Sequence, residues 1–254
     1  MNTSTNASRS EVHDYFDNPE NYFHGDQHNL GIQIRQSIIR SFLKDRSVDK
    51  LLDLACGNGL MSLQFCDEIE EITLLDFSKS MLELAKKNTP PHNTSVSYVH
   101  GDIESAELTN SHFDVVLAIG LIAHVKSQAR LVERLNELAA PGGLVIIQFT
   151  EGNHPWIKLI KRMRRQKNLI QKDSYALNHT VGTEIQAEFE KHGAHLVRKY
   201  RYEQFPAKPF KFLGKNFQQT FLRLLFGKPP RNRFGFAGSK CFYVFQKPSE
   251  TRVE

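Results

Sequence analysis

Long hydrophobic runs, paired cysteines and clustered metal ligands are all missing from this sequence of 254 residues. No apolar run reaches the roughly 18 residues that a membrane-spanning helix needs. The three cysteines (Cys56, Cys66 and Cys241) are odd in number and scattered. A disulfide framework is therefore not expected. The scattered cysteines instead indicate a reducing, cytoplasmic location. No Cys or His pair has the spacing of a structural zinc site, so no metal is expected.

Charge is spread unevenly along the chain. Residues 1–150 hold 12 Lys and Arg against 20 Asp and Glu, whereas residues 151–254 hold 21 against 8. An anionic partner for the second half is one interpretation, and a solvated basic surface is the other. The polar start of the chain, over residues 1–12, predicts a disordered tail rather than a signal peptide.

Apolar runs and amphipathic segments alternate through the middle of the chain. The predicted strands lie at 50–54, 72–75, 96–99, 113–119 and 144–149. The predicted helices between them lie at 60–65, 78–87 and 129–138, and Pro141-Gly142-Gly143 ends the last of these. The alternation predicts an α/β fold with a doubly wound, mostly parallel sheet.

The flanking segments add to this sheet. A helix is predicted over 30–42, with Leu30, Ile34, Ile38 and Phe42 on its buried side and Arg35 facing elsewhere. A helix at 181–191 and strands at 196–202 and 241–246 follow the fifth strand. Two aromatic and basic insertions, at 152–180 and 206–239, do not follow the alternation.

The sharpest chemical signal is the loop that continues from the first strand, Asp53-Leu54-Ala55-Cys56-Gly57-Asn58-Gly59. Its small residues let a ligand approach the backbone closely. Asp76 ends the second strand, where a carboxylate can bind both ribose hydroxyls, so an adenine nucleoside is indicated. Ser62 stands where the dinucleotide fingerprint needs a third glycine. Together with Asp53, placed to meet an ammonium group, this favours a nucleoside joined to methionine.

Five motifs in order resemble those of class I S-adenosylmethionine-dependent methyltransferases of the small-molecule type. They are the Asp53–Gly59 loop, Leu74-Leu75-Asp76-Phe77-Ser78 with Met81, Gly101-Asp102-Ile103, the run from Phe113 to Leu121, and Ala140-Pro141-Gly142-Gly143-Leu144. Ala55 replaces the first glycine of the first motif. The resemblance covers residues 48 to 150 and the last two strands, and it implies a seven-stranded Rossmann-like fold.

The resemblance also implies a division of the chain and a cofactor site. Residues 13–47 would form a lid and helix, 48–150 the core that binds S-adenosylmethionine, and 151–254 acceptor-binding insertions with strands six and seven of the same domain. Asp76 would bind the ribose, and Asp102 with the N–H of Ile103 the adenine edge. The residues implied to bind S-adenosylmethionine, or its product S-adenosylhomocysteine, are Asp53, Ala55, Cys56, Gly57, Asn58, Gly59, Asp76, Phe77, Met81, Asp102, Ile103, Ile119 and Gly120.

Fewer residues are candidates for the acceptor side. His124, five residues past the fourth strand, is the candidate general base, and a packing role is the alternative. Tyr15, Tyr22 and His28 in the implied lid, and Trp156 in the first insertion, are candidates to line the acceptor pocket.

These patterns predict an enzyme that moves a methyl group from S-adenosylmethionine to a small or medium organic acceptor by in-line displacement. The acceptor is expected to be anionic or amphipathic, with oxygen as the favoured atom. The chain lacks the Pro-Pro-aromatic tetrapeptide and the cysteine nucleophile of nucleic-acid enzymes, which argues against nucleic acid. Three alternatives stay open: a peripheral membrane enzyme for a lipid-like or quinone-like acceptor, a non-catalytic S-adenosylmethionine-binding protein, and an RNA methyltransferase. No pattern specifies an oligomeric state.

Overall fold

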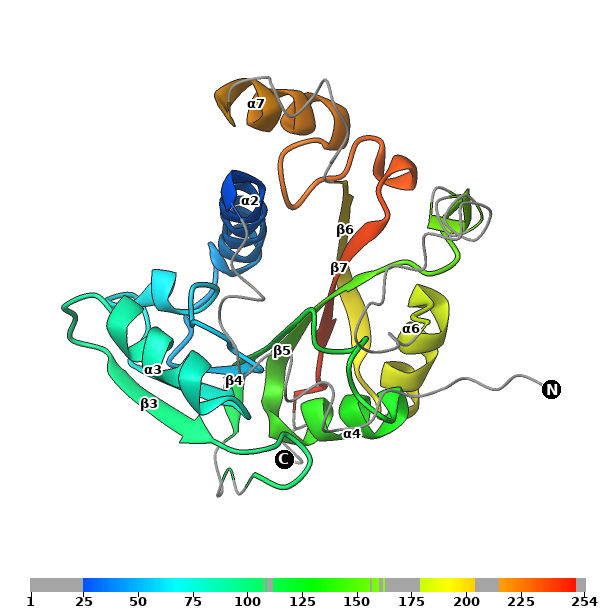
Figure 1. Cartoon of the computed structure of the whole chain (residues 1–254). Helices are drawn as coiled ribbons and strands as arrows, with labels where there is room; N and C mark the ends of the chain where they lie inside the picture. Colours follow the sequence, from blue (N-terminus) through cyan, green and yellow to red (C-terminus); the bar gives the residue numbers. More distant parts are fainter. Residues whose placement is uncertain are drawn as a thin grey trace.

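The computed structural model describes residues 25–106, 108, 112–155, 157–159, 162, 179–203 and 215–249, without the side chains of 25–29, 215, 216 and 219. A seven-stranded sheet with the order β3-β2-β1-β4-β5-β7-β6 runs through these residues (Figure 1). The strands are β1 (Lys50–Leu54), β2 (Glu71–Asp76), β3 (Ser95–His100), β4 (Phe113–Ile119), β5 (Ala139–Thr150), β6 (His195–Tyr202) and β7 (Lys240–Gln246). Strand β7 runs antiparallel to β5 and β6, and the other pairs of neighbouring strands are parallel. The predicted fold class is confirmed.

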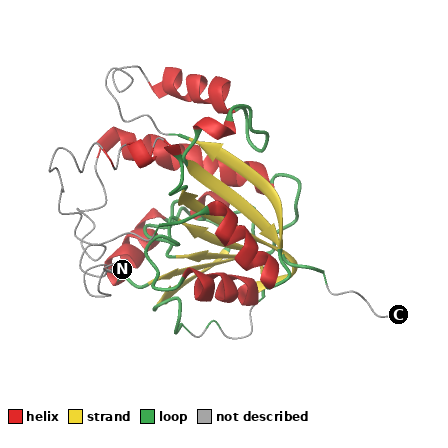
Figure 2. Ribbon diagram, turned by 90° about the vertical axis from the view of Figure 1, so that its right-hand side faces the viewer, coloured by secondary structure: helices red, strands yellow, loops and turns green. Residues whose placement is uncertain are grey.

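Helices cover both faces of the sheet (Figure 2). They are α2 (Gly25–Leu43), α3 (Lys79–Asn88), α4 (Gln128–Leu138), α6 (Gly182–Lys191) and α7 (Lys215–Phe226), with 3-10 turns η2 (Leu63–Phe65) and η4 (Gly235–Ala237). One core cluster joins the sheet to α2, α3 and α7, and a second joins it to α4 and α6. None of the helices described is long and apolar enough to span a bilayer.

The central strands are buried on both faces, as their apolar runs predict. Leu51, Leu52 and Leu54 of β1 and Val115 to Ala118 of β4 are fully buried. A parallel strand covered by helices on both sides has no solvent-facing positions, so its sequence shows no alternation of polar residues.

The last strand belongs to the same core. Phe242, Tyr243 and Phe245 of β7 are at most 1% exposed. The Phe245 ring stacks on that of Phe189 from α6, with the ring centroids 3.9 Å apart. The C-terminal strands therefore complete the sheet that the first 150 residues begin.

Hydroxyl caps begin two of the helices. The Ser78 hydroxyl accepts the Met81 N–H at the start of α3, and the Ser127 hydroxyl accepts the Arg130 N–H at the start of α4. Each cap satisfies an N–H that has no partner within the first turn of its helix.

Two local predictions are wrong. The helix predicted over 60–65 is only the single turn η2, because the chain reverses at Asp67, in the left-handed region at φ 74°, to enter β2. Strand β5 begins at Ala139, directly after α4, and bulges past the Pro-Gly-Gly turn, where Gly142 has φ 76°. Part of the insertion over 206–239 forms the helix α7. The predicted tail over 1–12 lies outside the described residues.

Candidate functional site

The loop after β1 is built on alternate left-handed residues. Ala55, Gly57 and Gly59 have φ values of 55°, 54° and 75°, in a region that L residues rarely adopt. Cys56 donates its backbone N–H to the Leu75 carbonyl at 3.0 Å, which fastens the loop to β2. A Cβ added to Gly59 would lie 2.7 Å from Leu63 Cδ1, whereas one on Gly57 would meet nothing within 4 Å. Gly57 is therefore the point at which a ligand can approach the backbone.

Asp53 is buried beneath this loop. It is 1% exposed, and the Ser62 hydroxyl donates to its Oδ2 at 2.7 Å. Burial raises the pKa of Asp53 to about 7, against the Ser62 hydrogen bond and with a smaller contribution from Asp76. Ser62, which replaces the third glycine of the dinucleotide fingerprint, thus holds this carboxyl group. A ligand ammonium group would supply the counter-charge that Asp53 lacks.

Asp76 ends β2 beside the same loop. Its Oδ2 accepts the Gly57 N–H at 2.7 Å and its Oδ1 accepts the Ser78 N–H at 2.9 Å. Burial raises the pKa of Asp76, and these two hydrogen bonds and the nearby His100 oppose the rise. Each carboxylate oxygen has a further lone pair, so the group can also accept two ligand hydroxyls.

A cavity of about 150 Å³ lies beside these residues. It sits at the carboxyl ends of β1 and β4, where the strand order reverses, which is the usual ligand site of an open parallel sheet. The residues that line it are Arg35, Ala55, Gly57, Asp76, Phe77, Met81, Ile119, Gly120, Leu121 and His124. Apart from Arg35 and Leu121, all are predicted from the sequence. In the described part of the chain, no three His, Cys, Asp or Glu residues are grouped to hold a metal ion.

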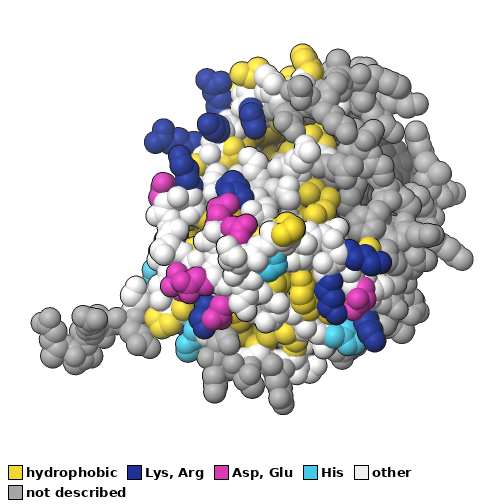
Figure 3. All heavy atoms as spheres, turned by 90° about the vertical axis from the view of Figure 1, so that its left-hand side faces the viewer, with side chains coloured by type: hydrophobic (Ala, Val, Ile, Leu, Met, Phe, Trp, Pro, Cys, Tyr) yellow, Lys and Arg dark blue, Asp and Glu magenta, His cyan; other side chains and the backbone are white. Residues whose placement is uncertain are grey.

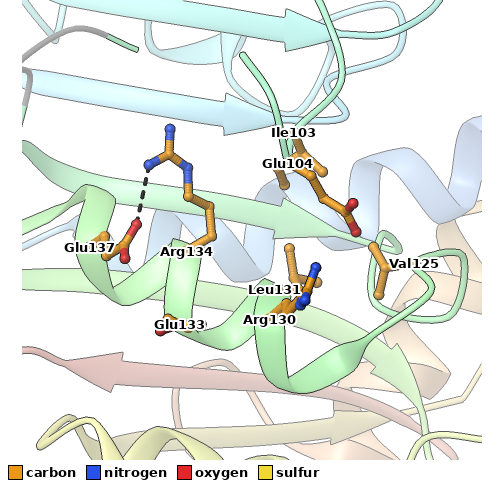
Figure 4. A pocket seen from close by; sticks show the side chains of 8 residues that line it. All are labelled: Ile103, Glu104, Val125, Arg130, Leu131, Glu133, Arg134 and Glu137. Carbon is orange, nitrogen blue, oxygen red and sulfur yellow. Dashed lines mark hydrogen bonds and ion pairs between the residues drawn. The ribbon is translucent and has the colours of Figure 1, made fainter. Parts of the chain in front are cut away.

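The other predicted cofactor residues, Asp53, Cys56, Asn58, Gly59, Asp102 and Ile103, do not line this cavity. Asp102 follows β3, and its Oδ1 accepts the Glu104 N–H at 2.8 Å. Ile103 lines a neighbouring cavity of about 180 Å³ between the loop after β3 and α4. Figure 4 shows Ile103 and Glu104 on one side of it, and Val125 and the side chains of α4 on the other. The adenine-binding role of Asp102 and Ile103 stays a prediction.

His124 lies in the turn after β4. Its backbone N–H donates to the Leu121 carbonyl at 2.8 Å, and the residue lines the cavity. Burial lowers the pKa of His124 to about 4. The imidazole is therefore neutral at neutral pH, which a proton acceptor requires. Its catalytic role stays a prediction.

Arg35 lines the cavity, although the helical pattern predicts that it faces away from the buried side of the helix. The buried side of α2 is centred on Ile38, Ile39 and Phe42, each at most 2% exposed. Arg35 precedes Ile39 by four residues and so lies on the same side of the helix, toward the sheet. The regular spacing of Leu30, Ile34, Ile38 and Phe42 favoured a buried side that excludes Arg35. An arginine four residues before an isoleucine is a weak signal that could have revealed it.

A row of polar side chains continues from the cavity along the face of the sheet that α2 covers. Gln148 pairs with Ile119 in register, and its Oε1 lies 3.8 Å from the position of a Cβ added to Gly120. Further along, Lys240 pairs with Tyr202. Directly opposed residues of an antiparallel pair share a face, and Tyr202 packs in the core cluster on the α2 side. We call Gln148, Tyr202 and Lys240 the polar row.

Two members of the polar row are buried, Lys240 is half-buried, and Arg35 lies near Tyr202 and Lys240. Gln148 is 6% exposed and Tyr202 2%. Burial raises the pKa of Tyr202 well above its usual range, and the charge of Arg35 opposes the rise. Burial also lowers the pKa of Lys240, against the effect of Glu203, and Arg35 lowers it further. The Tyr202 hydroxyl has no hydrogen-bond partner in the described residues. These groups offer hydrogen-bond donors beside the cavity.

Four predicted acceptor residues cannot be placed. Tyr15, Tyr22 and Trp156 lie outside the described residues. His28 belongs to α2, but its side chain also lies outside them.

A family model described as a methyltransferase domain matches residues 52–147, which run from β1 through most of β5. This part of the chain therefore carries a methyltransferase domain. The residues that line the cavity at β1 and β4 lie within the matched segment, apart from Arg35. The predicted fold is thereby confirmed, and residues 52–147 match the kind of domain that the sequence predicts.

Relatives and solved structures agree with this assignment. A demethylmenaquinone methyltransferase of Staphylococcus haemolyticus is 28% identical over 170 residues, 63% of this chain and 69% of that protein. An uncharacterized methyltransferase of Mycobacterium bovis is 32% identical over 100 residues, 39% of this chain, and only half the length of that relative is matched. The structure of magnesium protoporphyrin IX methyltransferase from Synechocystis with bound S-adenosylhomocysteine superposes with a TM-score of 0.66 at 13% identity, over 94% of this chain and all of that one. This last likeness is one of fold.

Proposed function

We propose that this chain is an enzyme that transfers a methyl group from S-adenosylmethionine to an oxygen atom of a small organic acceptor. The observation that carries the proposal is the cavity at the carboxyl ends of β1 and β4, where Gly57, Asp76 and His124 meet. Bound S-adenosylmethionine would supply a methyl group activated by the sulfonium charge.

The residues of the site divide the work of binding and alignment. Asp76 would accept the ribose hydroxyls, and Gly57 would let the ligand pass close to the backbone. Asp53, buried beneath the loop, would attract the ammonium group through its negative charge. In-line displacement depends mainly on holding the acceptor oxygen behind the methyl group. His124, neutral at neutral pH, would take the proton from the acceptor hydroxyl as the new C–O bond forms.

Arg35 and two members of the polar row support an acceptor with an acidic oxygen. Arg35, Tyr202 and Lys240 are all hydrogen-bond donors, and donors stabilise the negative charge that develops when a hydroxyl loses its proton. A phenol or a quinol-like hydroxyl fits this requirement. The relative named demethylmenaquinone methyltransferase supports a quinone-like acceptor molecule, without supporting oxygen as the methylated atom.

Cofactor binding is tested first by calorimetry with S-adenosylhomocysteine and with NAD. We expect the former to bind and the latter not to bind. Asp76→Ala should weaken S-adenosylhomocysteine binding by roughly 30- to 1000-fold, because two charge-assisted hydrogen bonds are lost. The exposed Asp45→Ala is the matched control and should bind normally. Unchanged affinity in a folded Asp76→Ala protein would refute the assigned site.

The acceptor atom is tested by following S-adenosylhomocysteine formation with matched phenols and anilines. We expect turnover with the phenols, and weaker turnover in Tyr202→Phe. Transfer to the anilines alone would overturn the choice of oxygen. Binding of S-adenosylmethionine without any turnover would support the non-catalytic alternative.

A further inference from the structure

Helix α7 presents apolar side chains to solvent. Phe217, Phe221 and Leu224 are 55%, 37% and 62% exposed. Their spacing of four and three residues places them on one side of the helix. The Phe217 and Phe221 rings stack on each other, 6.5 Å between centroids. The opposite side, with Leu222 and Phe226, is buried against the core.

Exposed apolar residues are concentrated in this part of the chain. Of the seven exposed large hydrophobic residues in the described part of the chain, five lie between positions 217 and 236. Phe234 and Phe236, around η4, are 45% and 77% exposed. Single apolar residues on a surface need no explanation, but a gathered set indicates an interaction.

A basic groove lies beside α7. Five cations and a single acid, Glu68, contribute to the lining of this groove of about 450 Å³, the cations being Arg40, Lys44, Arg46, Arg223 and Lys228. Glu68 pairs with Arg40 at 2.6 Å. From position 204 to 249 the sequence contains no Asp or Glu. Figure 3 shows Lys and Arg side chains gathered on the upper part of this face, with hydrophobic side chains at the top.

We propose that α7 and the groove beside it dock the protein on an anionic lipid bilayer. The docking surface consists of the apolar stripe, Phe217, Phe221 and Leu224, with Arg223 and Lys228 at its flank. An amphipathic helix of this kind lies in the bilayer interface, with apolar side chains among the acyl chains and cations at the headgroups. Each cation within a Debye length of an anionic surface adds to the attraction.

Charge and geometry favour a bilayer over other partners. A second copy of the chain would bring the same basic groove against itself, and like charges would repel across a two-fold interface. Single-stranded RNA needs aromatic faces on which bases can stack. Here the Phe217 and Phe221 rings stack on each other, the Phe234 and Phe236 rings pack edge to face, and Leu224 is aliphatic. A bilayer uses both the apolar stripe and the positive charge.

The docking surface lies next to the acceptor side of the domain. A cavity of about 70 Å³ between α2 and α7 is lined by Ile34 from α2, by Leu222 and Phe226 from α7, and by Tyr202 of the polar row. A bilayer bound at α7 would therefore hold lipid-dissolved molecules close to the polar row. This extends the proposed function to acceptors that partition into lipid.

Vesicle flotation with the full chain tests the proposal. The probes are vesicles of phosphatidylcholine alone and vesicles in which a third of the lipid is phosphatidylglycerol. We expect binding to the anionic vesicles at low salt that weakens near physiological salt. Arg223→Gln with Lys228→Gln should weaken binding roughly 30-fold, since two interfacial charges are lost. Replacing Phe217, Phe221 and Leu224 together with serine should weaken it at least as much.

Matched controls separate the surface from general charge and folding. Lys87→Gln with Lys126→Gln removes the same charge from exposed positions elsewhere and should bind like the wild type. Melting temperature and S-adenosylhomocysteine affinity should be unchanged in every variant, so failure of docking is distinguishable from failure of the proposed activity. Absence of vesicle binding, or binding that survives the serine substitutions, would overturn the proposal. Tighter binding to a single-stranded RNA oligonucleotide than to vesicles would also overturn it.

Discussion

Asp53 is a carboxyl group whose charge depends on what occupies the site. Its pKa lies near 7 in the cofactor-free protein, and an ammonium group beside it would favour the ionised form. We therefore expect S-adenosylhomocysteine binding to release a proton near pH 7 and to strengthen as the pH rises through 7. Calorimetry at pH 7 in two buffers with different heats of ionisation measures the release. Equal heats in both buffers would contradict this role for Asp53.

The raised pKa of Asp53 should also make the stability of the protein depend on pH. Asp53 has an ordinary pKa of 3.8 in the unfolded chain, so the unfolded state ionises first as the pH rises. The cofactor-free protein should therefore lose stability between about pH 4 and pH 7, where the folded state binds the extra proton. Asp53→Asn should remove this loss, raising the free energy of unfolding at pH 8 by roughly 2–4 kcal/mol with little change at pH 4. Urea denaturation at the two pH values checks it.

Substitution of His124 distinguishes a catalytic role of this residue from a packing role. With its pKa near 4, the imidazole stays neutral down to about pH 5, so its protonation should not limit turnover above that pH. If it is the base, His124→Ala should lower turnover by roughly 10²- to 10⁴-fold while S-adenosylhomocysteine affinity stays nearly unchanged. The exposed His195→Ala is the control. Normal turnover with a lowered melting temperature would assign His124 to packing.

At the scale of the element, the loop after β1 contains one residue that suits its conformation poorly. Ala55 is left-handed at φ 55°, where alanine is strained and glycine is not. Ala55→Gly should therefore stabilise the protein by about 0.5–1 kcal/mol after the added flexibility of the unfolded chain is subtracted.

At Gly59 in the same loop, a substitution should destabilise the protein. Gly59→Ala should destabilise by more than Gly57→Ala, because both have positive φ but only position 59 brings the new Cβ against Leu63. Urea denaturation of the three variants gives the comparison. Equal losses at positions 57 and 59 would show that Leu63 moves aside freely.

At the scale of the whole molecule, the sheet makes the two oppositely charged parts of the chain interdependent. Strand β7 pairs with β5 over Leu144 to Thr150, and Arg201 of β6 contacts the buried Glu151 at 3.1 Å. We propose that residues 48–254 unfold as one domain, so far-UV and near-UV signals should follow a single urea transition. A fragment ending at residue 150 should not fold cooperatively, because the edge of β5 and its apolar face would be exposed. Two separate transitions would contradict this division.

The amino-acid sequence alone was enough to predict the fold class, most of the strands and most of the lining of the cavity. These features depend on short stretches of chain: apolar runs between loops, hydroxyl caps such as Ser78, and the loop from Asp53 to Gly59. In each case the residues that make the feature are neighbours in sequence, so their chemistry and spacing can be interpreted together.

Residues that act together across the fold could not be predicted in this way. The Ser62 hydroxyl donates to Asp53 across the loop after β1, and Arg35 reaches the cavity because α2 buries Ile39 rather than Ile34 most deeply. The pairing of Tyr202 with Lys240 depends on a strand that enters the sheet between β5 and β6. The exposed stripe of α7 could be distinguished from a core stripe only once its partners were placed. Register and helix rotation are set by packing between distant segments, which local periodicity does not encode.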